Sequence, residues 1–308
     1  MKAKHVIIYL LLVIVTSSCI RDEAPNAEAD ILSCRLPGIT MTTSPIINNN
    51  SVTLFVTPGT NISALAPEFT LTSGATITPA SGTERNFNSP QEYQVTAADG
   101  IWKKTYAISV IDTELATIYN FEDTISGKKY YIFVERENDK VIMEWASGNA
   151  GYAMTGVAKT ADDYPTFQIA NGKNGKCLSL VTRSTGFFGG LVGMPIAAGN
   201  LFIGSFDVNN AMSNPLQATK FGLPFRHVPT YLAGYYKYKA GDQFTEGGKP
   251  VEGKRDICDI YAIMYETSVS VPTLDGTNAF TSPNLVSMAR IKDAKETDEW
   301  TYFKLPFT

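Results

Sequence analysis

The stretch EYQVTAADGIWKKTYAISV, residues 92–110, decides the fold class expected for this chain. It holds two runs in which apolar and polar residues alternate, separated by Ala98-Asp99-Gly100. Asp-Gly between alternating runs is a strong signal for a tight hairpin turn. The stretch therefore predicts two antiparallel strands, and one face of the second strand is formed by Tyr106, Ile108 and Val110.

Short strands separated by turns continue on both sides of this hairpin. Upstream, residues 51–56 place Val52, Leu54 and Val56 on one face of a strand. Downstream, residues 116–308 hold many short β-rich runs bounded by Gly, Pro, Asn or Asp, without a helix-period segment of useful length. The chain is therefore expected to be all-β, with an antiparallel sandwich followed by a larger β-sandwich of the jelly-roll type.

Composition excludes several classes of function. The chain has 308 residues, a net charge of −4 and a pI near 5.4. Because it lacks a basic patch, nucleic acid is not an expected partner. The only histidine beyond the leader is His227, so a zinc site or a histidine-based triad has at most one imidazole available. No cofactor is expected, and a structural calcium ion stays open.

The first residues predict export. Lysines precede an apolar run at 6–15, and Thr16-Ser17-Ser18 leads into Cys19, which together indicate a signal peptide over residues 1–18. The arrangement resembles the lipobox of bacterial lipoproteins, which implies cleavage before Cys19 and lipidation of its thiol. Ile20-Arg21-Asp22-Glu23 is similar to the charged tag of Bacteroidetes lipoproteins on the outer face of the outer membrane. An ordinary signal peptide is the alternative. Residues 19–30 would then form a polar tether.

A second resemblance covers the next stretch, which we expect to be a domain over residues 31–113. Its carriers are Gly59-Thr60-Asn61-Ile62-Ser63-Ala64-Leu65, Gly74-Ala75-Thr76-Ile77-Thr78-Pro79 and Tyr93-x-Val95-Thr96-Ala97-x-Asp99-Gly100. They resemble an immunoglobulin-like module that is repeated in surface lipoproteins of gut Bacteroidetes. The resemblance implies a spacer that lifts the following domain off the membrane.

A third resemblance covers residues 118–308, which are similar to the "putative carbohydrate metabolism domain" family. The motifs that carry it are Trp145-x-x-Gly148-Asn149-x-Gly151, Leu180-x-Thr182-Arg183, Ala197-Ala198-Gly199-Asn200-Leu201-Phe202-x-Gly204, Lys220-Phe221-Gly222-x-Pro224-Phe225, Gly234-Tyr235-Tyr236-Lys237-Tyr238 and Asp259-Ile260-Tyr261-Ala262. In this family the chain normally continues beyond the strand at 300–307. The resemblance therefore implies a jelly roll that lacks its last strands and exposes a sheet edge.

The candidate binding site centres on the strand expected at residues 231–239. Alternation puts Tyr231, Tyr235 and Lys237 on one face, and such a face is a platform for sugar because flat rings pack on the C–H faces of pyranoses. The alternative is ordinary cross-strand tyrosine packing with lysines at the rim. Further candidates for this platform are Trp145, Phe225, Arg226 and His227.

Acidic residues give weaker signals. Paired carboxylates are the usual sign of a glycosidase, but the neighbouring acids Glu122 and Asp123, or Asp256 and Asp259, show no distinctive spacing. Catalytic residues therefore stay unknown. Asp256 and Asp259 are candidate ligand contacts. Arg183 is either a ligand contact or a structural partner of one of these two acids.

Two further features admit more than one interpretation. The apolar stretch at residues 186–190 is a lid, a partner patch or a simply packed loop, and the last is favoured. Three free thiols are favoured at Cys34, Cys177 and Cys258, with a bridge between the last two as the alternative.

The leading hypothesis is a lipid-anchored protein of the outer membrane that binds carbohydrate at the cell surface, either a polysaccharide or a host glycan. The alternatives are a glycoside hydrolase or other carbohydrate-active enzyme on the jelly-roll domain, and a structural or adhesion lipoprotein. Fold and family do not decide among them.

Overall fold

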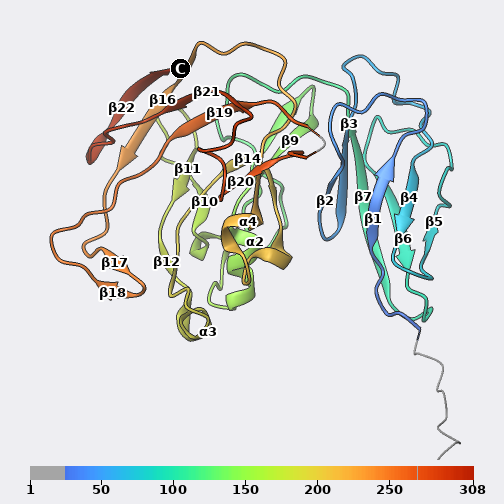
Figure 1. Ribbon diagram of the computed structural model, residues 1–308, viewed down its shortest axis with the longest axis horizontal. Coiled ribbons are helices and arrows are strands. Elements are labelled where there is room, and N and C mark those ends of the chain that lie inside the picture. Colours follow the sequence, from blue (N-terminus) through green and yellow to red (C-terminus); the bar gives the residue numbers. More distant parts are fainter. Residues whose placement is uncertain (1–24, 269) are drawn as a thin grey trace, which may run out of the picture.

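The computed structural model describes residues 25–268 and 270–308. The expectations for Cys19 and the signal peptide fall outside these residues. Strands make up 37% of the chain and helices 8%, so the predicted all-β class is confirmed. Figure 1 shows two groups of strands side by side, joined by the segment that follows β7.

The first group is a sandwich of a five-stranded sheet and a two-stranded sheet. The larger sheet has the order β2-β3-β7-β6-β5, and β1 pairs with β4. All pairings are antiparallel except that of β3 with β7. The strands are β1 (Ile31–Arg35), β2 (Ile46–Ile47), β3 (Ser51–Phe55), β4 (Glu68–Leu71), β5 (Thr76–Thr78), β6 (Gln91–Thr96) and β7 (Lys103–Ile111).

The predicted hairpin forms the centre of this sandwich. Tyr93 of β6 pairs with Tyr106 of β7, and the Asp99 carboxylate accepts the backbone N–H of Ile101 at 2.8 Å in the turn. The two predicted buried faces are confirmed, because every member is at most 2% exposed. They comprise Val52, Leu54, Val56, Tyr106, Ile108 and Val110.

The second group is built on the five-stranded sheet β20-β15-β14-β9-β8, with smaller pairs around it. These pairs are β10–β11, β12–β13, β16–β22, β17–β18 and β19–β21. The strands are β8 (Val134–Glu137), β9 (Lys140–Ala146), β10 (Thr166–Ile169), β11 (Cys177–Leu180), β12 (Arg183–Ser184), β13 (Ile196–Ala197), β14 (Phe202–Phe206), β15 (Thr219–Phe221), β16 (Tyr231–Tyr238), β17 (Thr245–Glu246), β18 (Lys249–Pro250), β19 (Tyr261–Tyr265), β20 (Leu274–Asp275), β21 (Leu285–Arg290) and β22 (Thr297–Pro306).

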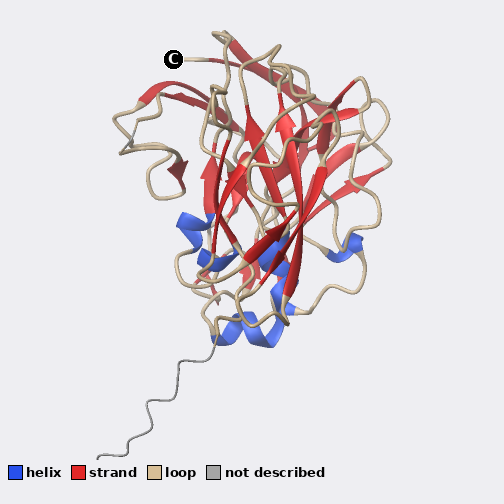
Figure 2. Cartoon of the chain, turned by 90° about the vertical axis from the view of Figure 1, so that its right-hand side faces the viewer, coloured by secondary structure: helices blue, strands red, loops and turns tan. Residues whose placement is uncertain are grey.

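Helices are short, and Figure 2 places most of them toward the lower end of the molecule. They are α2 (Asn149–Tyr152), η1 (Ala153–Thr155), η2 (Ala161–Asp163), α3 (Gly186–Leu191), η3 (Val208–Asn210) and α4 (Pro215–Ala218). Helix α3 corrects the expectation of a packed loop at residues 186–190. Its Phe187 side chain is 84% exposed and does not pack into the domain.

The three cysteines at positions 34, 177 and 258 are free, as favoured, so no bridge joins Cys177 to Cys258. Cys34 is buried in the first sandwich, and this burial raises the pKa of its thiol to about 12. Cys177 and Cys258 are only half-buried. Within the described ranges, no helix has the length and hydropathy needed to cross a membrane.

Candidate functional site

Strand β16 and strand β22 form an antiparallel ribbon at the edge of the second group (Figure 1). Exposed and half-buried residues alternate along the whole of β16, so Tyr231, Tyr235 and Lys237 share the exposed face. The partner strand adds its own side chains to this face, because Tyr302 lies opposite Tyr235. The ribbon thus presents aromatic side chains from two strands to solvent.

We call this face the aromatic ribbon and define it by Tyr231, Tyr235, Trp300 and Tyr302. The three tyrosines are 52%, 47% and 54% exposed, which is high for rings that are aligned on one face. The ring centroids of Tyr235 and Tyr302 lie 5.2 Å apart with a tilt of 53°. This cross-strand pair holds both rings in defined positions without burying them.

Three lysines lie over the rings of the aromatic ribbon. The Nζ atom of Lys304 is 4.0 Å from the Tyr231 ring centroid, and that of Lys237 is 5.5 Å from the Trp300 centroid. The third, Lys173, comes from the loop between β10 and β11, and its Nζ is 4.3 Å from the Tyr235 centroid. All three distances fall within the range of cation–π attraction.

The loop that carries Lys173 is held by a contact from outside the hairpin. The Glu122 carboxylate accepts the backbone N–H of Lys176 at 2.9 Å, and the N–H of Gly172 donates to the carbonyl of Gly175 at 2.9 Å. These hydrogen bonds therefore hold the loop so that Lys173 lies next to β16, a strand that is distant in sequence.

The opposite face of the ribbon supports these rings. The ring of Phe303 covers Gly234, where an added Cβ would come within 2.9 Å of the ring. The Tyr236 hydroxyl accepts the backbone N–H of Lys295 at 3.3 Å. Because Gly234 has no side chain, the Phe303 ring fits opposite it and β16 and β22 stay paired, while the other face of the ribbon remains available to solvent.

Trp145 lies on β9, in a separate aromatic cluster. Its centroid is 5.0 Å from that of Tyr119 and 5.5 Å from that of Phe121, and its indole N–H donates to the Glu135 carboxylate at 2.8 Å. Burial raises the pKa of Glu135, the Trp145 hydrogen bond lowers it, and the charge of Asp123 raises it further. Burial and the Glu135 charge raise the pKa of Tyr119 to about 12.

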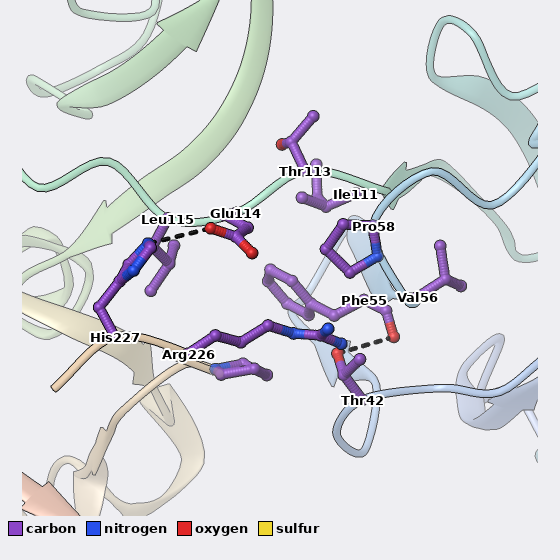
Figure 3. A pocket seen from close by; sticks show the side chains of 11 residues that line it. Thr42, Phe55, Val56, Pro58, Ile111, Thr113, Glu114, Leu115, Arg226 and His227 are labelled. Carbon is purple, nitrogen blue, oxygen red and sulfur yellow. Dashed lines mark hydrogen bonds and ion pairs between the residues drawn. The ribbon is translucent and has the colours of Figure 1, made fainter.

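Phe225, Arg226 and His227 lie at the junction between the two groups of strands. The His227 Nε2 atom is 2.9 Å from the Glu114 carboxylate, and the Phe225 and His227 rings are 5.4 Å apart. Figure 3 shows Arg226 extending across the small cavity there toward Thr42. The structure thus places these three residues at the junction, and the expectation that they join the aromatic ribbon stays a prediction.

Arg183 and the two candidate acids are also apart. The Arg183 guanidinium donates to the Asp162 carbonyl at 3.2 Å and lies over the Phe167 ring. Asp259 instead forms an ion pair with Arg290 at 2.7 Å. The expected ion pair of Arg183 with either acid is therefore not formed.

The last candidate, Asp256, is exposed in the loop before β19, where its carboxylate accepts the backbone N–H of Ile257 at 3.0 Å. Across the described part of the chain, no three His, Cys, Asp or Glu side chains gather closely enough to hold a metal ion.

Sequence reasoning missed Trp300, Tyr302, Lys304 and Lys173. The first three follow from one signal, the pairing of β16 with β22, which the period-2 pattern of each strand does not reveal. Once the register is known, residues directly opposite Tyr235 and its neighbours must share its face. No sequence pattern pointed to Lys173, because the loop between β10 and β11 brings it to the aromatic ribbon.

Comparison with known families divides the chain into two parts that coincide with the two groups of strands. A family model described as "Putative carbohydrate metabolism domain" matches residues 120–308. A second model, described as "SGBP, N-terminal", matches residues 31–110. Both halves of the chain therefore belong to carbohydrate-related domain types. No curated protein matches the chain.

Two solved structures from Bacteroides are similar to this chain. A "putative glycoside hydrolase" from Bacteroides thetaiotaomicron shares 85% identity with a TM-score of 0.89, over 94% of this chain and 84% of that one. A "putative glycoside hydrolase" from Bacteroides vulgatus shares 48% identity with a TM-score of 0.58, over 62% of this chain and 77% of that one. Since residues 120–308 make up more than half of the sequence, the protein belongs to the putative carbohydrate metabolism domain family and carries an SGBP N-terminal module ahead of that domain.

Proposed function

We propose that this protein binds carbohydrate at the cell surface through the aromatic ribbon. The observation that carries the proposal is three aligned tyrosines, each about half exposed, on a face that two paired strands hold in place. Contiguous exposed aromatic surface marks a binding site more often than scattered single residues do. Pyranose rings offer the matching surface, since their C–H faces pack on flat rings while hydroxyls bond polar groups at the rim.

The proposed arrangement is a lipid at Cys19, a short tether to about residue 30, a spacer sandwich over residues 31–113 and a binding domain over residues 118–308. The match of the first group to an SGBP N-terminal model supports this order. An anchor at one end and an aromatic face in the second domain would hold a glycan near the outer membrane without any need for catalysis.

Binding is tested with the full chain against a panel of polysaccharides by isothermal titration calorimetry. Tyr235→Ala and Tyr302→Ala should each weaken binding at least tenfold, because each removes one of the two paired rings. Trp102→Ala is the matched control, since Trp102 is 63% exposed in the first sandwich, and it should leave the affinity unchanged. If the folded protein binds no polysaccharide, the proposal is wrong.

The anchor is tested separately. In cells of a Bacteroides host, the protein should carry label from a radioactive fatty acid and fractionate with the outer membrane, whereas Cys19→Ser should do neither. A Cys34→Ser variant controls for loss of an unrelated thiol. Equal labelling of wild type and Cys19→Ser would contradict the proposed lipidation.

A hydrolase is the second candidate, and the cluster around Trp145 favours it. Glu135 combines a raised pKa, a charge interaction with Asp123 and a neighbouring aromatic ring, which are features that a general acid of a glycosidase shares. If the protein is a glycosidase at this site, Glu135→Gln should abolish release of reducing ends and Glu137→Gln should not. Absence of hydrolysis by the wild-type protein, across the polysaccharides that it binds, would exclude this candidate.

A further inference from the structure

The three lysines of the aromatic ribbon lack acidic partners. Eight ion pairs within 4.0 Å link side chains in the described part of the chain, and none of them includes Lys173, Lys237 or Lys304. The chain as a whole has a net charge of −4. Most other lysines and arginines of the described chain are also outside these pairs, so the position of the three ammonium groups over aromatic rings is what distinguishes them.

Acidic side chains near the aromatic ribbon either bond other groups of the protein or lie at one end of the ribbon. The Glu122 carboxylate is bound to the Lys176 backbone, and Glu296 pairs with Arg255. Asp298 and Glu299 are exposed where the β16–β22 register shifts, at the Tyr238 end of the ribbon. The lysines over Tyr231 and Tyr235 therefore lie away from Asp298 and Glu299, whereas Lys237 lies at the Trp300 end, next to these two acids in the chain.

We propose that the ligand of the aromatic ribbon is an acidic polysaccharide, one whose sugars carry carboxylate or sulfate groups. This inference rests on the proposed function and adds the class of glycan to it. The rings would take the C–H faces of the sugars, and the ammonium groups of Lys173, Lys237 and Lys304 would pair with the anionic substituents. Each ammonium lies over a ring face in the free protein, so it would move to the rim and pair with an anionic substituent when a sugar packs on that ring.

The spacing along the ribbon favours an extended polymer over a single sugar. Tyr231 and Tyr235 are four residues apart on one strand, and a strand advances about 3.4 Å per residue, so their rings recur after about 14 Å. A lysine accompanies each of them, and Lys237 continues the series at Trp300. Aromatic rings that recur over this length, each with a lysine over it, match a chain of linked sugars with repeated negative charges.

The experiment compares three polymers on the full chain at 50 mM and 300 mM NaCl: polygalacturonate for carboxylate, dextran sulfate for sulfate ester, and neutral pullulan. The acidic ligand should bind at least tenfold tighter than pullulan at the lower salt concentration, and its affinity should fall as salt rises. Comparing the affinity for polygalacturonate with that for dextran sulfate identifies which anion the lysines recognise.

The double substitution Lys237→Gln with Lys304→Gln provides the second measurement. It should weaken acidic-polymer binding at least tenfold and any pullulan binding far less, and Lys103→Gln on the first sandwich should change neither. Thermal unfolding midpoints of all variants confirm that they are folded. A weak, fully salt-sensitive attraction that Tyr235→Ala does not reduce would be non-specific, and it would overturn the inference.

Failure of this inference is distinguishable from failure of the proposed function. If pullulan binds as tightly as the acidic polymers, and Tyr235→Ala abolishes this binding, the protein is a carbohydrate binder without charge selectivity. If the wild-type protein binds none of the three polymers or the wider panel, both ideas are wrong.

Discussion

At the scale of single residues, a buried polar clamp fixes the motifs that carry the family resemblance. Asn149 is fully buried, and its side chain bonds both the carbonyl and the N–H of Thr166, at 2.7 and 3.1 Å. The Thr166 hydroxyl bonds the backbone of Asn200, whose side chain accepts the N–H of Gly148 at 2.8 Å. Both asparagines therefore hold strands and loops together.

Asn149→Ala should destabilise the protein by about 2–3 kcal/mol, because it leaves a buried N–H and a buried carbonyl of Thr166 without partners. Urea unfolding followed by tryptophan fluorescence measures the change. Asn174→Ala, in the exposed loop before β11, is the control and should stay within about 0.5 kcal/mol of wild type. A loss of similar size in both variants would contradict the role assigned to the clamp.

Asp30 gives a prediction about pH. The Lys104 ammonium, 2.5 Å from its carboxylate, lowers the pKa of Asp30 below its ordinary value, partly against burial, and the Tyr106 hydroxyl donates to it at 2.9 Å. A carboxyl with a lowered pKa stabilises the folded state above its unfolded pKa, and the effect is lost as pH falls through the folded pKa. The Asp30 side chain is 40% exposed, so the contribution should be only about 1 kcal/mol.

Asp30→Asn should therefore be less stable than wild type at pH 7, and the difference should shrink as pH falls below about 4. Denaturant titrations between pH 3 and pH 7 measure it. Asp242→Asn, an exposed acid in the loop after β16, should show no such trend. A difference between Asp30→Asn and wild type that is independent of pH would contradict the role of the charge.

At the scale of elements, contacts from distant segments shape the connection between β13 and β14. A loop at residues 198–201 separates the two strands. Gly199 packs so closely on the Pro165 carbonyl that an added Cβ would come within 2.5 Å of it, and Asn200 is held by Thr166. Tertiary contacts therefore fix this loop as much as local propensity does.

Gly204 in the middle of β14 gives a prediction at this scale. Its φ is +140°, and an added Cβ would overlap the carbonyl oxygen of Lys220 on β15. Gly204→Ala should cost about 3 kcal/mol, because it combines backbone strain with a clash against a paired strand. Chemical denaturation measures the loss.

Gly190→Ala is the matched control, since Gly190 lies in α3 with open space around its Cα. It should be neutral or stabilising by up to about 1 kcal/mol, because alanine favours a helix. If Gly204→Ala is as well tolerated as Gly190→Ala, the close β14–β15 approach is not required for stability.

At the scale of the whole molecule, pairs of polar side chains cross the junction between the two groups of strands. Asp112 and Lys140 are 2.7 Å apart and both less than one-third exposed, and Glu114 pairs with His227 nearby (Figure 3). The similar crystal structure keeps a TM-score of 0.89 over 94% of this chain, a share that includes both groups. The two groups of strands are therefore arranged in a similar way in both structures.

Lys140→Gln combined with Glu114→Gln should loosen this junction and leave each sandwich folded. Small-angle X-ray scattering should show a larger radius of gyration, while circular dichroism stays the same. Lys254→Gln, which breaks the exposed pair with Glu246 far from the junction, is the control and should leave the radius of gyration unchanged. An unaltered scattering curve for the double variant would show that apolar contacts at Ile111 and Leu115 are sufficient.

The local parts of the fold were predictable, and the assembly of the site was not. Alternation of apolar residues identified the buried faces around Tyr106 and Val52, because period-2 patterning is a property of a single strand. The same reasoning placed Tyr231, Tyr235 and Lys237 on one face, as the structure has them. It did not predict the partners of His227 and Asp259, because Glu114 and Arg290 lie 113 and 31 residues away in the chain.

The sequence by itself determined the all-β class, the hairpin at residues 92–110 and the alternation of the tyrosine strand, since each depends on interactions between near neighbours. Only the tertiary structure decided that Tyr302 and Lys304 complete the aromatic ribbon, that Lys173 reaches it from another hairpin, and that Arg226 and His227 belong to the junction. These outcomes depend on strand register and loop placement, which are set by the packing of segments that are far apart in the chain.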